Sequence, residues 1–295
     1  MKQDISFLIE RKNLLKNLSK WRIAAVVFLA LIIITNISKN NFISKKKPYI
    51  AKVKITGMIN DDDYRINKLN MLKNSDNVEA VIIKINSPGG TFVGGERLYN
   101  SIKKISKKKP VIAIIGDQAT SAAYLAAIGS DYIIASNGSL TGSVGVLLQA
   151  FEATNLAEKI GVTPIIIKSS SFKATPHPAE KFNQSDYNYL SKIVAQSKEI
   201  FLDIVKSERA NLTAESLKEI SLGKVFIGKK AKELNLIDAI GDEKNALDWL
   251  KSKNINNERI INIKLQKPNE NLKKLFQGIS NINFLNEGFK LYSIL

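Results

Sequence analysis

The chain has 295 residues, 44% of them hydrophobic, which suffices for one large globular domain or two small ones. It has no cysteine, which excludes disulfides, thiolate nucleophiles and cysteine-ligated metal sites. With a single histidine, His177, any histidine-based triad or histidine-rich metal cluster would depend on that residue alone. The formal net charge of +17 raises nucleic acid as a partner, and the placement of the charge argues against it.

Much of the charge excess lies near the N-terminus. Residues 1–50 contain ten lysines and arginines but only two acidic residues, and the basic residues flank an apolar run at 23–37. This arrangement favours a membrane over a nucleic-acid groove. Because no small-residue cleavage site follows the run, we predict an uncleaved transmembrane signal anchor at 23–37. The positive-inside tendency then predicts a cytoplasmic segment at 1–22 and an extracytoplasmic body.

After a linker at 38–49, β-rich runs and helical stretches alternate. In chain order we expect strand 50–55, helix 62–75, strand 80–85, helix 91–107, strand 111–115, helix 119–129, strands 132–135 and 144–148, helix 151–160, strand 163–168, helices 183–208, 212–220, 228–235 and 242–253, and strand 259–265. Short apolar strands separated by helices predict an α/β fold with mainly parallel pairing. The sequence does not assign a role to the apolar tail at 266–295.

Two loops that follow predicted strands have the composition of a catalytic site. In Asn86–Gly90, the glycine pair allows backbone N–H groups to approach a ligand, although Ser-Pro-Gly-Gly is also an ordinary turn. In the second loop, Ser121 stands between a buried strand and a small-residue helix, where the N–H of Ala122 is free to donate to an oxyanion. A serine at a helix start is also a common N-cap.

A nucleophilic serine needs a base, because its free hydroxyl is a poor nucleophile. His177 is one candidate, although the prolines on both sides of it predict a surface loop. A lysine kept neutral by desolvation is the other solution. The chain contains too many lysines for sequence proximity to select one, so both types of base remain open at this point.

Together these motifs resemble the signal peptide peptidase A (SppA) family of serine–lysine proteases. The resemblance runs from Ile50 to about Gly241, and the segments that carry it are 85–90, 119–124, 141–146 and 168–173. It implies the crotonase/ClpP-like ββα-type fold of the short, single-domain members. To that α/β protease domain, at 50–265, the sequence adds an N-terminal transmembrane helix and a helical C-terminal part.

The resemblance also implies a role for each matching residue. Ser121 becomes the nucleophile, and Lys173 becomes the general base and acid. Ser143 becomes the residue that orients Lys173, while the backbone N–H groups of Gly90 and Ala122 become the oxyanion hole. Family members commonly have Gly-Gly where this chain has Ala122-Ala123, so we expect the extra methyl groups to narrow the S1 pocket.

The function implied is a membrane-anchored serine endopeptidase that degrades remnant signal peptides and other apolar peptide segments. It would be a single-pass protein of the bacterial inner or cell membrane and would bind lipids through 23–37. We expect a homo-oligomeric ring with active sites at subunit boundaries, with no cofactor, metal or nucleic acid.

Two other functions remain as alternatives. One is a proteolytically inactive membrane scaffold of the same fold. The other is a crotonase-like acyl-CoA enzyme, which commonly uses carboxylates near the site, whereas neither the 86–90 nor the 119–124 loop contains one. We interpret Asp117, Tyr124 and His177 as structural residues.

Overall fold

The structure is a computed structural model that describes residues 20–23, 25–29 and 47–266. The chain divides into two compact units, Met1–Lys47 and Pro48–Leu295. In the first unit, the described residues 20–23 and 25–29 are helical, and most of the predicted anchor lies outside the described residues. No helix within the described ranges is long and apolar enough to cross a membrane. All but the first residue of the predicted tail also lies outside them.

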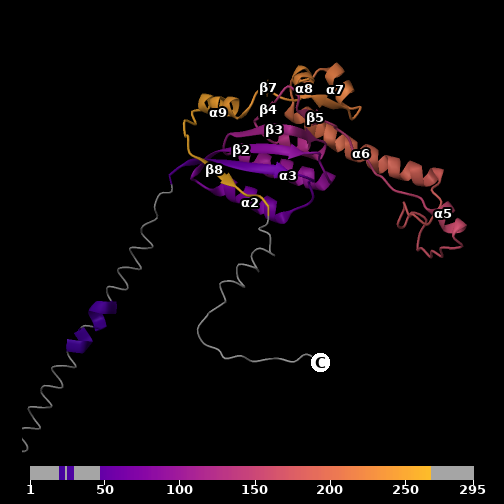
Figure 1. Cartoon of the computed structure of the whole chain (residues 1–295), viewed down its shortest axis with the longest axis horizontal. Helices are drawn as coiled ribbons and strands as arrows, with labels where there is room; N and C mark the ends of the chain where they lie inside the picture. Colours follow the sequence, from indigo (N-terminus) through magenta and orange to yellow (C-terminus); the bar gives the residue numbers. More distant parts are fainter. Residues whose placement is uncertain (1–19, 24, 30–46, 267–295) are drawn as a thin grey trace, which may run out of the picture. The chain divides into compact units, whose positions relative to one another are not determined.

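The described part of the second unit is built around an eight-stranded sheet (Figure 1). Its strands are β1 (Tyr49–Thr56), β2 (Val78–Ser87), β3 (Val111–Thr120), β4 (Tyr132–Ala135), β5 (Leu140–Gly142), β6 (Val225–Ile227), β7 (Ala239–Ile240) and β8 (Ile260–Ile263). The main path runs β6-β5-β3-β2-β1-β8, and β4 pairs with β3 and β7. Only β5 and β6 pair antiparallel in this part of the chain, which confirms the predicted α/β fold with mainly parallel pairing.

Strand β3 has two successive partners on one side. Its first half, at 112–115, pairs with β4, and its last residues, at 118–120, pair with β5. Gly116 lies between the two halves, and glycine inside a strand commonly marks a bend or bulge. The end of β3 is thereby directed to Gly142, at the end of β5.

Helices cover both faces of the sheet (Figure 1). They are α2 (Asp63–Asn74), α3 (Phe92–Ser106), α4 (Ala122–Ala127), α5 (Thr154–Lys159), α6 (Gln184–Glu208), α7 (Ala214–Ile220), α8 (Gly228–Glu233) and α9 (Glu243–Ser252). The larger core packs α2, α3 and α4 against one sheet face, through residues such as Leu69 and Leu98. A smaller cluster packs Ala246 and Leu250 of α9 against the other face. These apolar contacts hold the parallel sheet between two layers.

Residues 145–183, here called the arm, leave the sheet and lie along the N-terminal half of α6, with α5 at its far end (Figure 1). Two predicted strands are therefore wrong, because 144–148 and 163–168 form no strand. Val144 is buried in the main core, whereas several of the other apolar residues face solvent, with Ile165 87% and Ile167 94% exposed. The helix predicted at 119–129 begins only at Ala122, because β3 continues to Thr120.

Candidate active site

Ser121 joins β3 to α4 in a backbone conformation that is unusual for a residue with a side chain. Its φ is 54° and its ψ is −124°, a combination that crowds Cβ against the backbone and persists only where the surroundings enforce it. Two hydrogen bonds do so: the Ser121 N–H donates to the Gly142 carbonyl at 2.9 Å, and the Ser121 carbonyl accepts from the Leu125 N–H at 2.9 Å. The strand-to-helix turn thus presents the Ser121 side chain at its apex.

The Ser121 hydroxyl is not used as a helix cap. Ser121 occupies the N-cap position of α4, but its side chain makes no capping hydrogen bond. The N-cap residues Thr91 and Asn183 do accept such bonds at the starts of α3 and α6. The half-buried Ser121 hydroxyl is therefore available for chemistry, and the ordinary capping explanation for a serine at this position does not hold.

The glycine loop touches the Ser121 turn. A Cβ built on Gly89 would lie 3.0 Å from Ser121 Cβ and 3.2 Å from the Ala122 nitrogen, so only glycine fits there. Gly90 forms a parallel bridge with Ile59, in which the Ile59 N–H donates to the Gly89 carbonyl and the Thr91 N–H donates to the Ile59 carbonyl. This pattern leaves the Gly90 N–H without an acceptor among the described residues.

Ala122 supplies a second N–H beside the same turn. As the first residue of α4, it has no intrahelical acceptor for this N–H. Its methyl group is buried against α3, because a Cβ on Gly95 would come within 2.8 Å of Ala122 Cβ. Ala123 is also fully buried in the main core. Both methyl groups therefore pack inside the fold, and their effect on an S1 pocket stays a prediction.

Ser143 lies next to the Ser121 turn. Gly142 of β5 is the register partner of Thr120 of β3. The residues that directly follow this pair are Ser143 and Ser121, so they lie at neighbouring strand ends. The Ser143 backbone has a φ of 53°, and its N–H donates to the Lys224 carbonyl at 2.8 Å. The structure therefore brings together Ser121, the glycine loop, Ala122 and Ser143.

Lys173 is not brought into contact with Ser121 in this chain. It lies exposed in a turn of the arm, where its N–H donates to the Ser170 carbonyl at 3.2 Å. Its ammonium group has no ion pair or hydrogen bond within the described part of the chain. His177 also lies on the arm, where its Nδ1 accepts the Ala179 N–H at 3.2 Å.

Comparison with known proteins identifies the family. The profile of peptidase family S49 matches residues 103–256, more than half of the chain. The chain belongs to peptidase family S49. The Clp protease profile also matches residues 48–138, in agreement with the predicted ClpP-like fold.

Several curated relatives of this S49 chain carry the names of proteases. It is 32% identical over 209 residues to "Putative protease MJ0651" of Methanocaldococcus jannaschii, an alignment that covers 70% of this chain and 66% of the relative. It is also 32% identical over 210 residues to "Putative protease slr0021" of Synechocystis, an alignment that covers 70% of this chain and 75% of the relative. A "Putative signal peptide peptidase SppA" of Enterococcus faecium is 29% identical and is covered to 64%. The predicted resemblance to SppA-type serine proteases is confirmed at the level of the family.

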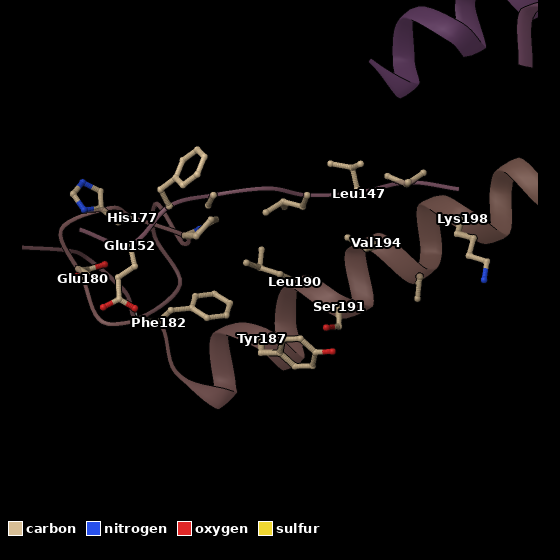
Figure 2. Close-up of a pocket in the computed structure, with 16 residues that line it drawn as sticks. Leu147, Glu152, His177, Glu180, Phe182, Tyr187, Leu190, Ser191, Val194 and Lys198 are labelled. Carbon is tan, nitrogen blue, oxygen red and sulfur yellow. Dashed lines mark hydrogen bonds between the residues drawn. The ribbon is translucent and has the colours of Figure 1, made fainter. Parts of the chain in front are cut away.

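The arm of this S49 chain also forms an apolar groove. It has a volume of about 770 Å³ and lies between the extended segment at 146–151 and the first half of α6 (Figure 2). Leu147, Leu190 and Val194 line its middle, and His177 and Glu180 stand at one end. The sequence did not predict this groove, because the 144–148 run was interpreted as a strand of the sheet.

A group of hydrogen bonds, here called the clasp, joins the end of α6 and helix α4 to the turn at 235–238, and the sequence did not predict it. At the end of α6, Arg209 Nε donates to the Asn235 carbonyl at 2.8 Å, and Arg209 Nη1 donates to Asp238 Oδ2 at 3.0 Å. The hydroxyl of Tyr124, on α4, donates to the Leu236 carbonyl in the same turn at 2.8 Å. Burial raises the pKa of Tyr124, which keeps this phenol protonated. Tyr124 thus has the structural role predicted for it.

Asp117 has a structural role as well, because its Oδ2 accepts a hydrogen bond from Asn86 Nδ2 at 2.7 Å. This bond links the bend of β3 to the start of the glycine loop.

Proposed function

We propose that this S49 peptidase is a membrane-anchored serine endopeptidase in which Ser121 is the nucleophile and Lys173 the general base. The observation that carries the proposal is the Ser121 turn, with its positive φ, its uncapped hydroxyl and two unpaired N–H groups beside it. This is the arrangement that acyl transfer requires: a presented hydroxyl and preorganised donors for the oxyanion.

In the proposed reaction, neutral Lys173 accepts the Ser121 proton as the hydroxyl oxygen attacks the peptide carbonyl. The N–H groups of Gly90 and Ala122 donate to the oxyanion of the tetrahedral intermediate, each contributing about 3 kcal/mol. Protonated Lys173 then gives its proton to the leaving amine, and water hydrolyses the acyl-enzyme. Ser143 is proposed to hydrogen-bond the lysine and orient it.

The lysine is proposed to come from a neighbouring subunit, in a homo-oligomeric ring with active sites at subunit boundaries. Two observations support this: Lys173 is exposed on the arm, and the arm presents many large apolar side chains to solvent. Leu147 and Phe151, for example, are 80% and 78% exposed. Apolar area of this extent is typical of a surface that another subunit covers.

The substrates proposed are remnant signal peptides and other apolar segments. A predicted anchor at 23–37 would keep the enzyme at the bacterial inner or cell membrane, with a cytoplasmic N-terminus and an extracytoplasmic catalytic domain. Such a location gives access to apolar peptides that remain in the bilayer.

Hydrolysis of a fluorogenic apolar peptide by the full-length chain tests the dyad. Ser121→Ala and Lys173→Ala are each expected to lower kcat/KM by at least ~1,000-fold. Lys181→Ala, which removes another exposed lysine of the arm, is the matched control and is expected to stay within about twofold of wild type. Because only a neutral lysine accepts a proton, wild-type kcat/KM should rise with pH between about 6 and 10.

Each contrary result points to a specific alternative. A flat pH profile, or a fully active Lys173→Ala variant, would remove the lysine as the base, and His177→Ala would then be tested. A folded, assembled wild-type protein without any peptidase activity would favour the inactive membrane scaffold.

A further inference from the structure

Three lysines form a row across one open face of the sheet. Lys54 of β1 is the register partner of Lys84 of β2. Lys264 follows β8 directly, one position beyond the Val53–Ile263 pair, and therefore continues the row on the other side of Lys54. Neighbouring strands lie about 4.8 Å apart, and alternate residues face the same side, so all three side chains leave the same face close together. All three are exposed.

Within residues 47–266, none of these three lysines forms an ion pair. Lys52, two residues before Lys54 on the same face, forms an ion pair with Glu243 at the start of α9. The lysine beneath α9 therefore has a counter-charge within the chain. Lys84 borders a hollow of about 580 Å³ whose lining also includes Asp117, Asp242 and Glu243. Each of these carboxylates has another partner, because Asp117 accepts from Asn86, Asp242 caps α9 and Glu243 pairs with Lys52. Like charges on paired strand positions are unfavourable, which suggests that an anion outside this part of the chain neutralises the row.

The rest of the chain is a poor source of that anion. Residues 267–295 contain four lysines and two glutamates, and residues 1–47 contain ten basic and two acidic residues. A second copy is no better, because the whole chain has a net charge of +17. The complementary partner is therefore a different, anionic molecule.

The shape and position of the face favour an anionic lipid surface. Around the row, the exposed residues Thr56, Asn262 and Gln266 give a largely polar sheet surface, although the exposed Leu140 lines the hollow beside Lys84. β1 begins directly after the linker, and residues 38–48 can extend over at most ~40 Å, so an anchor at 23–37 would keep the start of β1 within that distance of the bilayer. We infer that the Lys54–Lys84–Lys264 row binds anionic phospholipid headgroups and lays this sheet face on the membrane. The inference rests on the membrane anchoring proposed above.

The absence of cysteine makes a direct test possible. In the full-length chain, Asn262→Cys places a single fluorophore on the lysine face, and Lys104→Cys places one on α3 at the opposite sheet face. Each protein is incorporated into vesicles of phosphatidylcholine, alone or mixed with phosphatidylglycerol, that contain a headgroup-linked quencher. We expect stronger quenching at position 262 than at 104 in the anionic vesicles only, and its loss in high salt, which screens such contacts.

Substitutions identify the lysines responsible. In the Lys54→Gln, Lys84→Gln, Lys264→Gln triple variant, the ratio of docked to undocked protein should fall by about fivefold per lysine. The matched control replaces the exposed lysines Lys107, Lys108 and Lys192 by glutamine and should quench as the parent protein does.

Flotation with the vesicles separates the two possible failures. If the parent protein does not float, membrane anchoring is wrong and the inference fails with it. If it floats but position 262 is quenched no more than position 104, or equally in both lipid mixtures, anchoring survives and the inference alone is overturned. If the control variant loses docking to the same extent as the triple variant, the inference is also overturned. Without lipid docking, binding of a DNA duplex that needs the same three lysines would assign the row to nucleic acid instead.

Discussion

At the scale of single residues, Ser121 combines strain with an unused hydroxyl. A non-glycine residue at φ 54° and ψ −124° costs about 1–3 kcal/mol, and the hydrogen bonds at both ends of the turn maintain it. Glycine adopts this conformation without the steric penalty but loses about 0.5–1 kcal/mol of chain entropy. We therefore expect the strain at Ser121 to lower the free energy of unfolding, while the same turn presents the proposed nucleophile.

Comparison of Ser121→Gly with Ser121→Ala isolates this strain, because both variants lack the hydroxyl. We expect both to be inactive and the glycine variant to be more stable to urea unfolding by about 1 kcal/mol. The alanine variant retains a Cβ and serves as the reference. Equal unfolding midpoints for the two would show that the turn stores no strain.

Gly90 provides a second test at this scale. A Cβ at this position would fall 1.9 Å from the Ile59 carbonyl oxygen, so alanine must displace the loop that presents the Gly90 N–H. Gly90→Ala is therefore expected to lower kcat by at least about 100-fold, as loss of an oxyanion donor does. Gly138→Ala, where a Cβ meets no atom within 4 Å, is the control. Circular dichroism would verify the fold, and an active, folded Gly90→Ala enzyme would remove this N–H from the proposed oxyanion hole.

The residues around Ser121 were accessible from sequence because they follow strands whose ends converge in the fold. Lys173 was not accessible from spacing alone, because the chain contains many lysines; only the family resemblance selects it, and its role stays a prediction. The direction of the Ala122 methyl group was also hidden, because it depends on Gly95 of α3, which is distant in sequence.

At the scale of elements, most strands and helices could be predicted from apolar periodicity, and the failures occur in the arm. The runs at 144–148 and 163–168 are as apolar as the sheet strands, but they have no neighbouring strand to pair with. Periodicity shows that a residue is apolar but not which surface it contacts, so the exposed apolar residues of the arm resemble those of a core strand.

The clasp at the end of α6 gives a prediction at this scale. Arg209 is only 11% exposed, so replacing it removes charge-assisted hydrogen bonds and leaves Asp238 without its cation. We expect Arg209→Gln to lower the free energy of unfolding by about 2 kcal/mol, measured by urea denaturation. Lys206→Gln is the matched control on the same helix, because its exposed pair with Asp203 should contribute less than ~0.5 kcal/mol. If both variants lose the same stability, the clasp does not anchor α6.

At the scale of the whole molecule, the chain separates its proposed chemistry into two parts. Within residues 47–266, the body contains the proposed nucleophile Ser121 with two proposed oxyanion donors and no base in contact with it, while the arm contains the exposed Lys173 amid apolar surface. Burial of that surface by a neighbouring subunit would exclude water from the same place where the lysine must be neutral. Assembly and activation would then be one event, and an isolated subunit would be inactive.

Mixing two inactive variants tests this division. Ser121→Ala subunits contain an intact lysine, and Lys173→Ala subunits contain an intact serine. If each site joins the serine of one subunit to the lysine of the next, random co-assembly of equal amounts restores about one quarter of wild-type activity. If both residues act within one chain, no mixture has activity. Co-expression followed by titration of active serines would count the restored sites directly, because sites within one chain would give none and sites between subunits would give the predicted fraction.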